Sequence, residues 1–108
     1  MPRMVLVTVN SVGSTHAVTV MPESLPIPAG ERGPIQWKIT NPAAEGWRFQ
    51  TNGIEIANAG AEFDHPNGGG GVVFTWNNNH TKPGTYKYTV RVANNTANAE
   101  IDPWIANN

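Results

Sequence analysis

The sequence contains no cysteine, and only 14% of its 108 residues are charged. Without cysteine the chain cannot form a disulfide, a thiolate nucleophile, an iron–sulfur cluster or a zinc site built on sulfur. The seven Lys and Arg residues are scattered, and the formal net charge is −1. No basic stripe is therefore available to neutralise a phosphate backbone, and we expect no nucleic-acid partner.

Long apolar runs are also missing from the sequence. The run at residues 4–9 is interrupted by Thr8 and is too short for a signal peptide or a membrane span. We expect no membrane partner. The expected location is cytoplasmic by default, or extracytoplasmic if a leader was removed from the chain.

The size and the apolar content fit one folded domain. A chain of 108 residues can bury one hydrophobic core, and 39% of the residues are hydrophobic. We expect a single domain over residues 1–108.

Four segments alternate apolar and polar residues, as strands with one buried face do. These segments are residues 4–10, 15–21, 34–40 and 85–92. The last is the clearest, with Tyr86 and Tyr88 on the apolar side, and Trp37 and Trp76 are expected in the core. Prolines limit residues 25–28 to a short edge segment, because proline lacks a main-chain donor.

The remaining segments predict shorter strands and loops. Residues 47–50 and 54–57 are expected to be short strands around a turn at 51–53, and residues 41–46 and 64–71 to be loops. Pro103 indicates an edge or a bulge within a last strand at residues 99–105. No apolar stripe of helical period occurs, so the sequence predicts an all-β sandwich of about seven to eight short strands.

The run Pro83-Gly84-Thr85-Tyr86-Lys87-Tyr88 is similar to the P-G-x-Y-x-Y element of cupredoxins and to the tyrosine corner of immunoglobulin-like domains. The order of elements between residues 15 and 37 also resembles cupredoxins: a strand, a short edge segment ending in a glycine turn, and a strand with Trp37. The resemblance covers residues 15–92 and implies a Greek-key sandwich. It also implies a hydrogen bond from a buried Tyr86 hydroxyl to a main-chain group across the corner.

A type 1 copper centre uses a Cys, two His and usually an axial Met. In the register that the resemblance implies, Val90 stands at the Cys position and Ala93 at one His position. Residues 45–47 contain no His, and no Met follows Val92. We therefore expect the fold without a metal and without any cofactor.

By the same resemblance, the strand at residues 85–92 runs toward the end of the sandwich where ligands bind. The loops at residues 41–47, 64–71 and 93–98 are expected at that end, and the loop containing His80 at the other. The predicted ligand-binding residues are Trp47, Asp64, His65, Asn94 and Asn95. His65 beside Asp64 could hold a divalent ion or orient a proton transfer, and the competing interpretation is a solvated loop pair.

Two other histidines have structural interpretations. His16 alternates with Val18 and Val20, which is typical of a hydrogen-bonded residue at the boundary of a core. His80 follows three asparagines whose side chains favour Asx-turns.

No nucleophile elbow and no placed pair of carboxylates occurs in the sequence, so we expect no enzyme. The leading hypothesis is a non-catalytic, metal-free binding or structural interaction domain. Its partner could be another protein or a second copy pairing along the strand edge at residues 5–9, which carries no proline and no charge. The alternative is a carbohydrate-binding module that uses an exposed Trp47 or Trp104, and a small hydrolytic or metal-dependent enzyme comes third.

Overall fold

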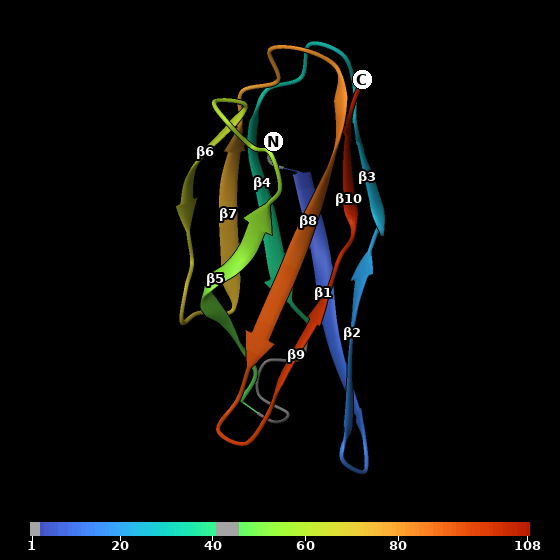
Figure 1. The fold of residues 1–108 in the computed structure, drawn as a ribbon, viewed down its shortest axis with the longest axis vertical. Coiled ribbons are helices and arrows are strands. Elements are labelled where there is room, and N and C mark those ends of the chain that lie inside the picture. The colour runs from blue at the N-terminus through green and yellow to red at the C-terminus, as the bar shows by residue number, and fades with distance from the viewer. Residues whose placement is uncertain (1–2, 41–45) are drawn as a thin grey trace.

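The computed structural model describes residues 3–40 and 46–108, which contain ten strands and no helix (Figure 1). The strands are β1 (Arg3–Val12), β2 (Thr15–Met21), β3 (Ser24–Ile27), β4 (Gly33–Ile39), β5 (Arg48–Ile56), β6 (Phe63–Asn67), β7 (Val73–Asn78), β8 (Gly84–Ala93), β9 (Asn98–Ile101) and β10 (Trp104–Asn107).

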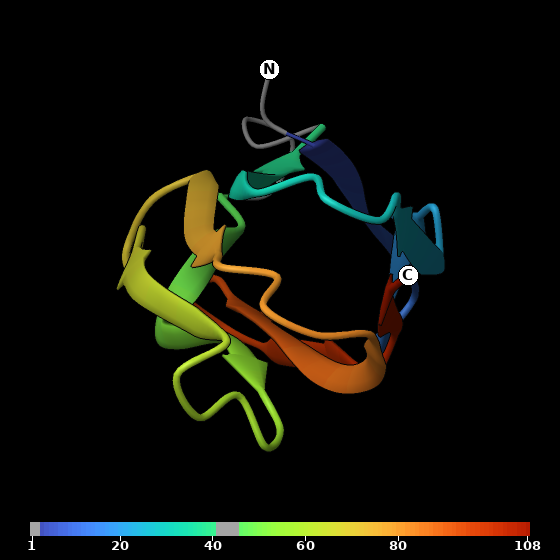
Figure 2. The same cartoon turned by 90° about the horizontal axis from the view of Figure 1, so that it is seen from above.

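The strands form two packed sheets. The first has the order β2-β1-β4-β7-β6, and the second has the order β3-β10-β8-β5 with β9 paired to β8. Both sheets are mixed, because β1 runs parallel to β4 and β3 parallel to β10. Seen from above, the strands surround one interior (Figure 2). The predicted all-β architecture is confirmed.

The core lies between the sheets and is filled by the faces that the alternation predicts. Its residues on β1, β4 and β8 are Val5, Val7, Val9, Ile35, Trp37, Ile39, Tyr86, Tyr88, Val90 and Val92. Trp37 of the first sheet meets Tyr88 of the second edge to face, with ring centres 5.3 Å apart. Such pairs stabilise a core beyond the area that they bury.

β1 lies inside its sheet and not at an edge. It pairs with β2 from Leu6 opposite Met21 to Val12 opposite Thr15, and on its other side with β4 from Arg3 to Val7. The prediction of a free pairing edge at residues 5–9 is therefore wrong. The alternation of a strand shows which face is buried, but not which strands lie beside it.

Three further boundaries differ from the prediction. Residues 48–56 form one strand, β5, with a register shift between Phe49 and Ile54 in place of a turn. Half of the expected loop at 64–71, residues 64–67, belongs to β6. The last strand is divided at Pro103, whose carbonyl accepts the Tyr88 main-chain N–H at 3.0 Å. The described residues contain ten strands, where seven to eight were expected.

The short edge segment is confirmed as β3, which ends the second sheet. The predicted loop at residues 41–46 lies outside the described residues, apart from Gly46.

Candidate functional site

Trp47, the aromatic member of the predicted ligand site, is buried. It is 1% exposed, and its ring meets His16 of β2 edge to face at 5.3 Å. Trp47 therefore packs into the sandwich, and its ring is not exposed for stacking on a ligand. His16 is a boundary residue as predicted, with Nδ1 2.7 Å from the Ser11 hydroxyl.

Asp64 and His65 lie at the start of β6, where Asp64 is opposite Asn77 of β7. The Asp64 carboxylate accepts hydrogen bonds from Asn79 at 3.1 Å and from Asn77 at 3.0 Å, and lies 2.8 Å from Nδ1 of His65. The hydrogen bond from Asn79, then those from His65 and Asn77, lower the pKa of Asp64 to about 2. The side chain of His65 is 83% exposed and that of Asp64 42% exposed, so this pair stands at the surface.

Asn94 and Asn95 form the turn between β8 and β9. Oδ1 of Asn94 accepts the main-chain N–H groups of Thr96 and Ala97 at 2.9 Å and 2.8 Å. This is an Asx-turn, which stabilises the loop in the way that Asn commonly does. Asn95 is exposed.

The structure does not bring the five predicted site residues together. β8 begins beside the loop that contains His80 and ends at Ala93, so Asn94 and Asn95 lie at the far end (Figure 1). Asp64 pairs in the half of β7 that leads to His80. The error comes from treating residues 64–71 as one loop. Only the glycine stretch reaches the far end, where the Gly71 carbonyl accepts the Phe49 N–H at 2.8 Å.

Within residues 3–40 and 46–108, no three His, Asp or Glu side chains lie close enough to hold a metal ion. No helix in the same residues has the length and apolar character needed to cross a membrane.

The buried polar groups gather instead at the His80 end. In the described part of the chain the buried polar side chains are Glu62, Asn78, His80 and Asn107. Asn78 of β7 and Asn107 of β10 exchange amide hydrogen bonds at 2.8 Å and 3.2 Å, which tie one sheet to the other. Oδ1 of Asn78 also accepts the His80 main-chain N–H at 3.0 Å, which forms the Asx-turn that the sequence predicts.

The ring of His80 points into this end of the sandwich. Nδ1 lies 2.7 Å from the Glu31 carbonyl oxygen, and Nε2 lies 2.8 Å from the main-chain oxygen of Asn108. The sequence predicted the turn but not the burial. Both oxygen partners come from segments far away in the chain, and no local pattern could have revealed them.

Glu62 fixes the loop that follows His80. Its carboxylate accepts the main-chain N–H and the hydroxyl of Thr81 at 2.6 Å and 2.9 Å, and the main-chain N–H of Lys82 at 3.3 Å. Burial opposes ionisation of Glu62, but these hydrogen bonds outweigh it and lower the pKa of the carboxyl. The negative charge is therefore held in place by main-chain donors.

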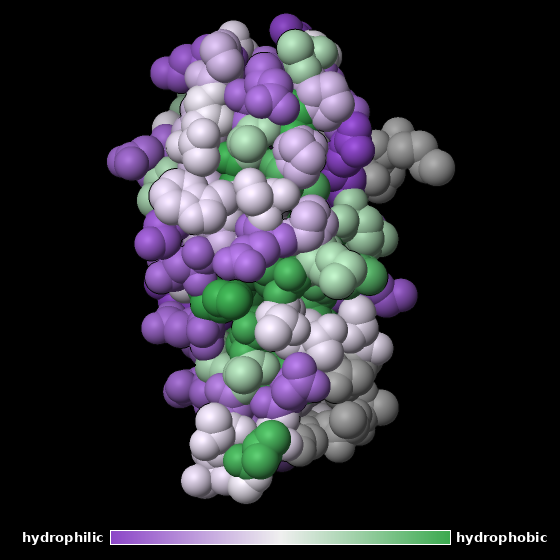
Figure 3. Space-filling model, turned by 90° about the vertical axis from the view of Figure 1, so that its right-hand side faces the viewer, coloured by the Kyte–Doolittle hydropathy of each residue, from purple (hydrophilic) through white to green (hydrophobic). Residues whose placement is uncertain are grey.

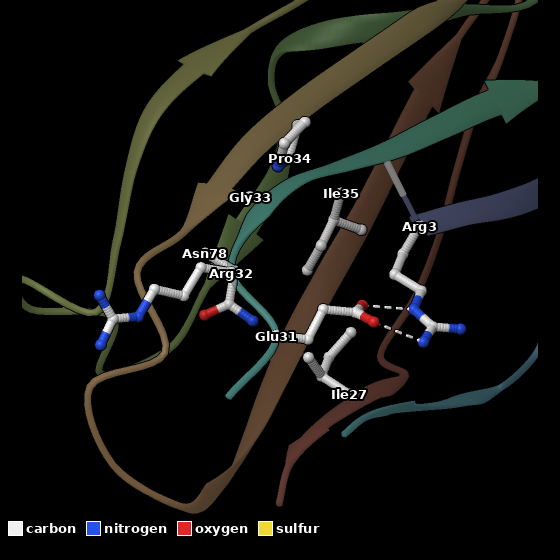
Figure 4. A pocket seen from close by; sticks show the side chains of 8 residues that line it. All are labelled: Arg3, Ile27, Glu31, Arg32, Gly33, Pro34, Ile35 and Asn78. Atoms are coloured by element: carbon white, nitrogen blue, oxygen red, sulfur yellow. Dashed lines mark hydrogen bonds and ion pairs between the residues drawn. The ribbon is translucent and has the colours of Figure 1, made fainter. Parts of the chain in front are cut away.

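Three hollows lined by described residues open at this end. One, of about 160 Å³, is lined by Gly30, His80–Pro83 and Asn108, and another, of about 200 Å³, lies between residues 58–62 and Tyr86. The third is much smaller and contains the Arg3–Glu31 ion pair over Ile27 and Ile35, while Arg32 extends away (Figure 4). The hydrogen bond from Arg3 lowers the pKa of Glu31. These hollows are small for a site that encloses a drug-sized ligand.

Tyr86 borders the second hollow. Among the described residues, the Tyr86 hydroxyl has no hydrogen-bond partner. The hydroxyl lies close to Gly84, where an added Cβ would be 3.5 Å from its oxygen. The main-chain hydrogen bond expected across the corner is therefore not formed.

A different surface carries exposed apolar side chains. Leu6 of β1 lies directly opposite Met21 of β2, and Met4 projects from the same outer face two residues before Leu6. Their exposures are 42%, 72% and 43%. We call Met4, Leu6 and Met21 the apolar patch. Apolar surface also gathers across the middle of the side that carries β2, β3 and β10 (Figure 3).

No protein-family model matches the chain, and a search of the curated proteins finds no significant match.

Proposed function

We propose that this chain is a non-catalytic, metal-free β-sandwich domain that binds a protein partner through the outer face of β1 and β2. The observation that carries the proposal is the apolar patch. Clustered exposed apolar side chains mark interaction surfaces more often than isolated ones do. Two of the three are methionines, whose flexible side chains adapt to different partners.

The surroundings of the patch suit a protein surface. Lys38 of β4 lies opposite Leu6, and Thr8 and Thr19 continue the outer face beyond Leu6 and Met21. Polar groups therefore border an apolar centre, which is the usual arrangement of a protein–protein interface.

A cupredoxin-like Greek-key topology is the finer part of the proposal. It is supported by the order of β2, the short β3, a turn in which Gly30 has a φ of +83°, and β4 with Trp37. This is the order on which the resemblance in the sequence rests.

The non-catalytic part of the proposal rests on how the histidines are held. Both ring nitrogens of His80 lie within hydrogen-bond distance of main-chain oxygens, which occupy the positions that a substrate would need beside the ring. His65 pairs with Asp64 on an open surface, where nothing encloses a reacting group.

The experiment places a photo-crosslinking amino acid at Met21 in one variant and at Asn10 in another. Asn10 is the matched control because it is exposed on the same outer face, opposite Ala17. We expect a discrete adduct from position 21 and none from position 10, either with a second copy of the purified chain or with a protein of the source cells. The adduct should vanish when Leu6→Glu is added. Equal adducts from both positions, or none from position 21, would refute the proposal.

A second candidate, carbohydrate binding, is favoured by one observation. Trp104 is 42% exposed, and the Lys87 ammonium lies 5.6 Å from the centre of its ring. An exposed tryptophan can stack on a sugar ring. Among the described residues, Trp104 is the one Trp, Tyr or Phe with an exposed side chain. A sugar could therefore stack on one ring but not on a pair of rings. Binding in a glycan array that Trp104→Ala abolishes and Leu6→Glu leaves unchanged would select this function instead.

A further inference from the structure

The ring of His80 is enclosed between two main-chain oxygens. The residue is 6% exposed. Its Nδ1 lies 2.7 Å from the Glu31 carbonyl and its Nε2 lies 2.8 Å from the Asn108 oxygen, both within ordinary hydrogen-bond distance.

The number of donors on the ring decides whether this arrangement is favourable. A neutral imidazole has one N–H, and its other nitrogen carries a lone pair that can only accept a hydrogen bond. An oxygen facing that lone pair would leave two buried acceptors in contact without a proton between them, which is costly in a site of low dielectric. The protonated ring has two N–H groups, one for each oxygen.

The two contacts join three separate parts of the fold. His80 belongs to the connection between β7 of the first sheet and β8 of the second. Glu31 lies in the turn between β3 and β4, and Asn108 follows β10, where its main-chain N–H donates to the Ile27 carbonyl at 3.0 Å. The ring therefore holds the open end of the sandwich together from inside.

We propose that His80 is a proton-operated clamp. With both nitrogens protonated, it binds the β3–β4 turn and the segment after β10 to the β7–β8 connection. Loss of one proton breaks one of the two hydrogen bonds and releases the residue on that side. The hollow that His80, Lys82 and Asn108 line then changes shape with pH.

The charges around the ring come from each neighbouring segment. The Glu31 carboxylate favours the protonated ring, but it is shared with Arg3 of β1. Lys82 in the same connection opposes a positive charge, and Glu62 reaches this connection through Thr81. From β7 and β10 come the amides of Asn78 and Asn107, which do not titrate. A change in the protonation of the ring therefore acts on the two hydrogen bonds from the ring to the oxygens of Glu31 and Asn108.

The first measurement needs no variant. Nitrogen NMR of the imidazole ring reports which ring nitrogens carry a proton, and hydrogen exchange of the Asn108 amide reports whether the end is closed. Both are followed from about pH 5 to about pH 8 in the intact chain, with exchange corrected for its intrinsic pH dependence. We expect two protonated nitrogens at the acid side, and Asn108 protection that falls by up to about tenfold per pH unit as one proton is lost.

The matched variants are His80→Gln and His16→Gln. Glutamine donates from one nitrogen and does not titrate in this range, so Asn108 protection in His80→Gln should be low and independent of pH. His16 contacts Ser11 and Trp47 and not the clamp, so its variant should keep the pH response. If His80→Gln does not fold, the nitrogen NMR and hydrogen exchange of the wild-type protein still test the proposal. A ring with one unprotonated nitrogen over the whole range, or Asn108 protection that does not follow the ring, overturns the proposal.

Discussion

Replacing Tyr88 by phenylalanine should stabilise the protein. Tyr88 lies in the centre of the core, 1% exposed, and neither its hydroxyl nor the indole N–H of Trp37 has a hydrogen-bond partner. An unsatisfied buried hydroxyl costs about 1 to 3 kcal/mol, and phenylalanine removes it while keeping the edge-to-face contact with Trp37. Allowing for the small void that is left, we expect a gain of about 1 kcal/mol in the free energy of unfolding.

The same hydroxyl should make the protein sensitive to alkali. Burial raises the pKa of Tyr88 from 10.0 to about 12, and the indole N–H of Trp37, which lies near the hydroxyl but does not meet hydrogen-bond geometry, partly lowers it. Above pH 10 the unfolded chain releases the proton and the folded one keeps it, so stability falls as pH rises toward 12. Two pKa units correspond to at most about 3 kcal/mol. Tyr88→Phe should lack this loss.

The assay is urea unfolding of wild type, Tyr88→Phe and the control Tyr86→Phe, at neutral pH and between pH 10 and 12. Tyr86 lies on the same strand and the same face, but its hydroxyl borders a hollow. The control should therefore stay within about 0.5 kcal/mol of wild type. A destabilisation of Tyr88→Phe by more than about 1 kcal/mol would mean that the hydroxyl is hydrogen-bonded after all, and would refute the reasoning.

Three further predictions concern single positions. Glu62→Ala removes the acceptor of two main-chain N–H groups and should cost about 2 to 4 kcal/mol in chemical denaturation, whereas Glu55→Ala, at an exposed ion pair, should cost less than about 1 kcal/mol; equal costs would contradict this. Gly68→Ala would bring its Cβ into collision with the Val73 carbonyl oxygen and should be clearly less stable than Gly70→Ala, which shares the positive φ but has open space; equal losses of stability would show that the shared φ and not the collision dominates. The pKa of Asp64 is lowered from 3.8 to about 2, so the stability that its charge contributes is present above pH 3.8 and is lost as pH falls through 2; an acid-unfolding curve of Asp64→Asn identical to that of wild type would rule this out.

The sequence predicts the fold best where the alternation of apolar and polar residues identifies the buried face of a strand. Alternation assigned the inner faces of β1, β4 and β8 correctly, because burying one face of a strand selects every second residue. Alternation failed for β6. The sequence Phe-Asp-His-Pro-Asn buries one apolar side chain, Phe63, and does not alternate, and the strand pairs with β7 around a register shift. An edge strand of this kind leaves no alternating hydrophobic pattern to read.

The errors in the site have a different cause, which is the distance in sequence between partners. Trp47 precedes β5, and nothing in its local sequence shows that His16 of β2 packs against its ring. The local sequence of His80 indicates only a turn, and does not show that the main-chain oxygens of Glu31 and Asn108 contact its two ring nitrogens. The local sequence predicts the turn at His80 correctly, and for both residues the contacts that decide what the side chain can do come from distant segments of the chain. Charge state and exposure depend on those contacts, so function at such positions has to be argued from the assembled sandwich.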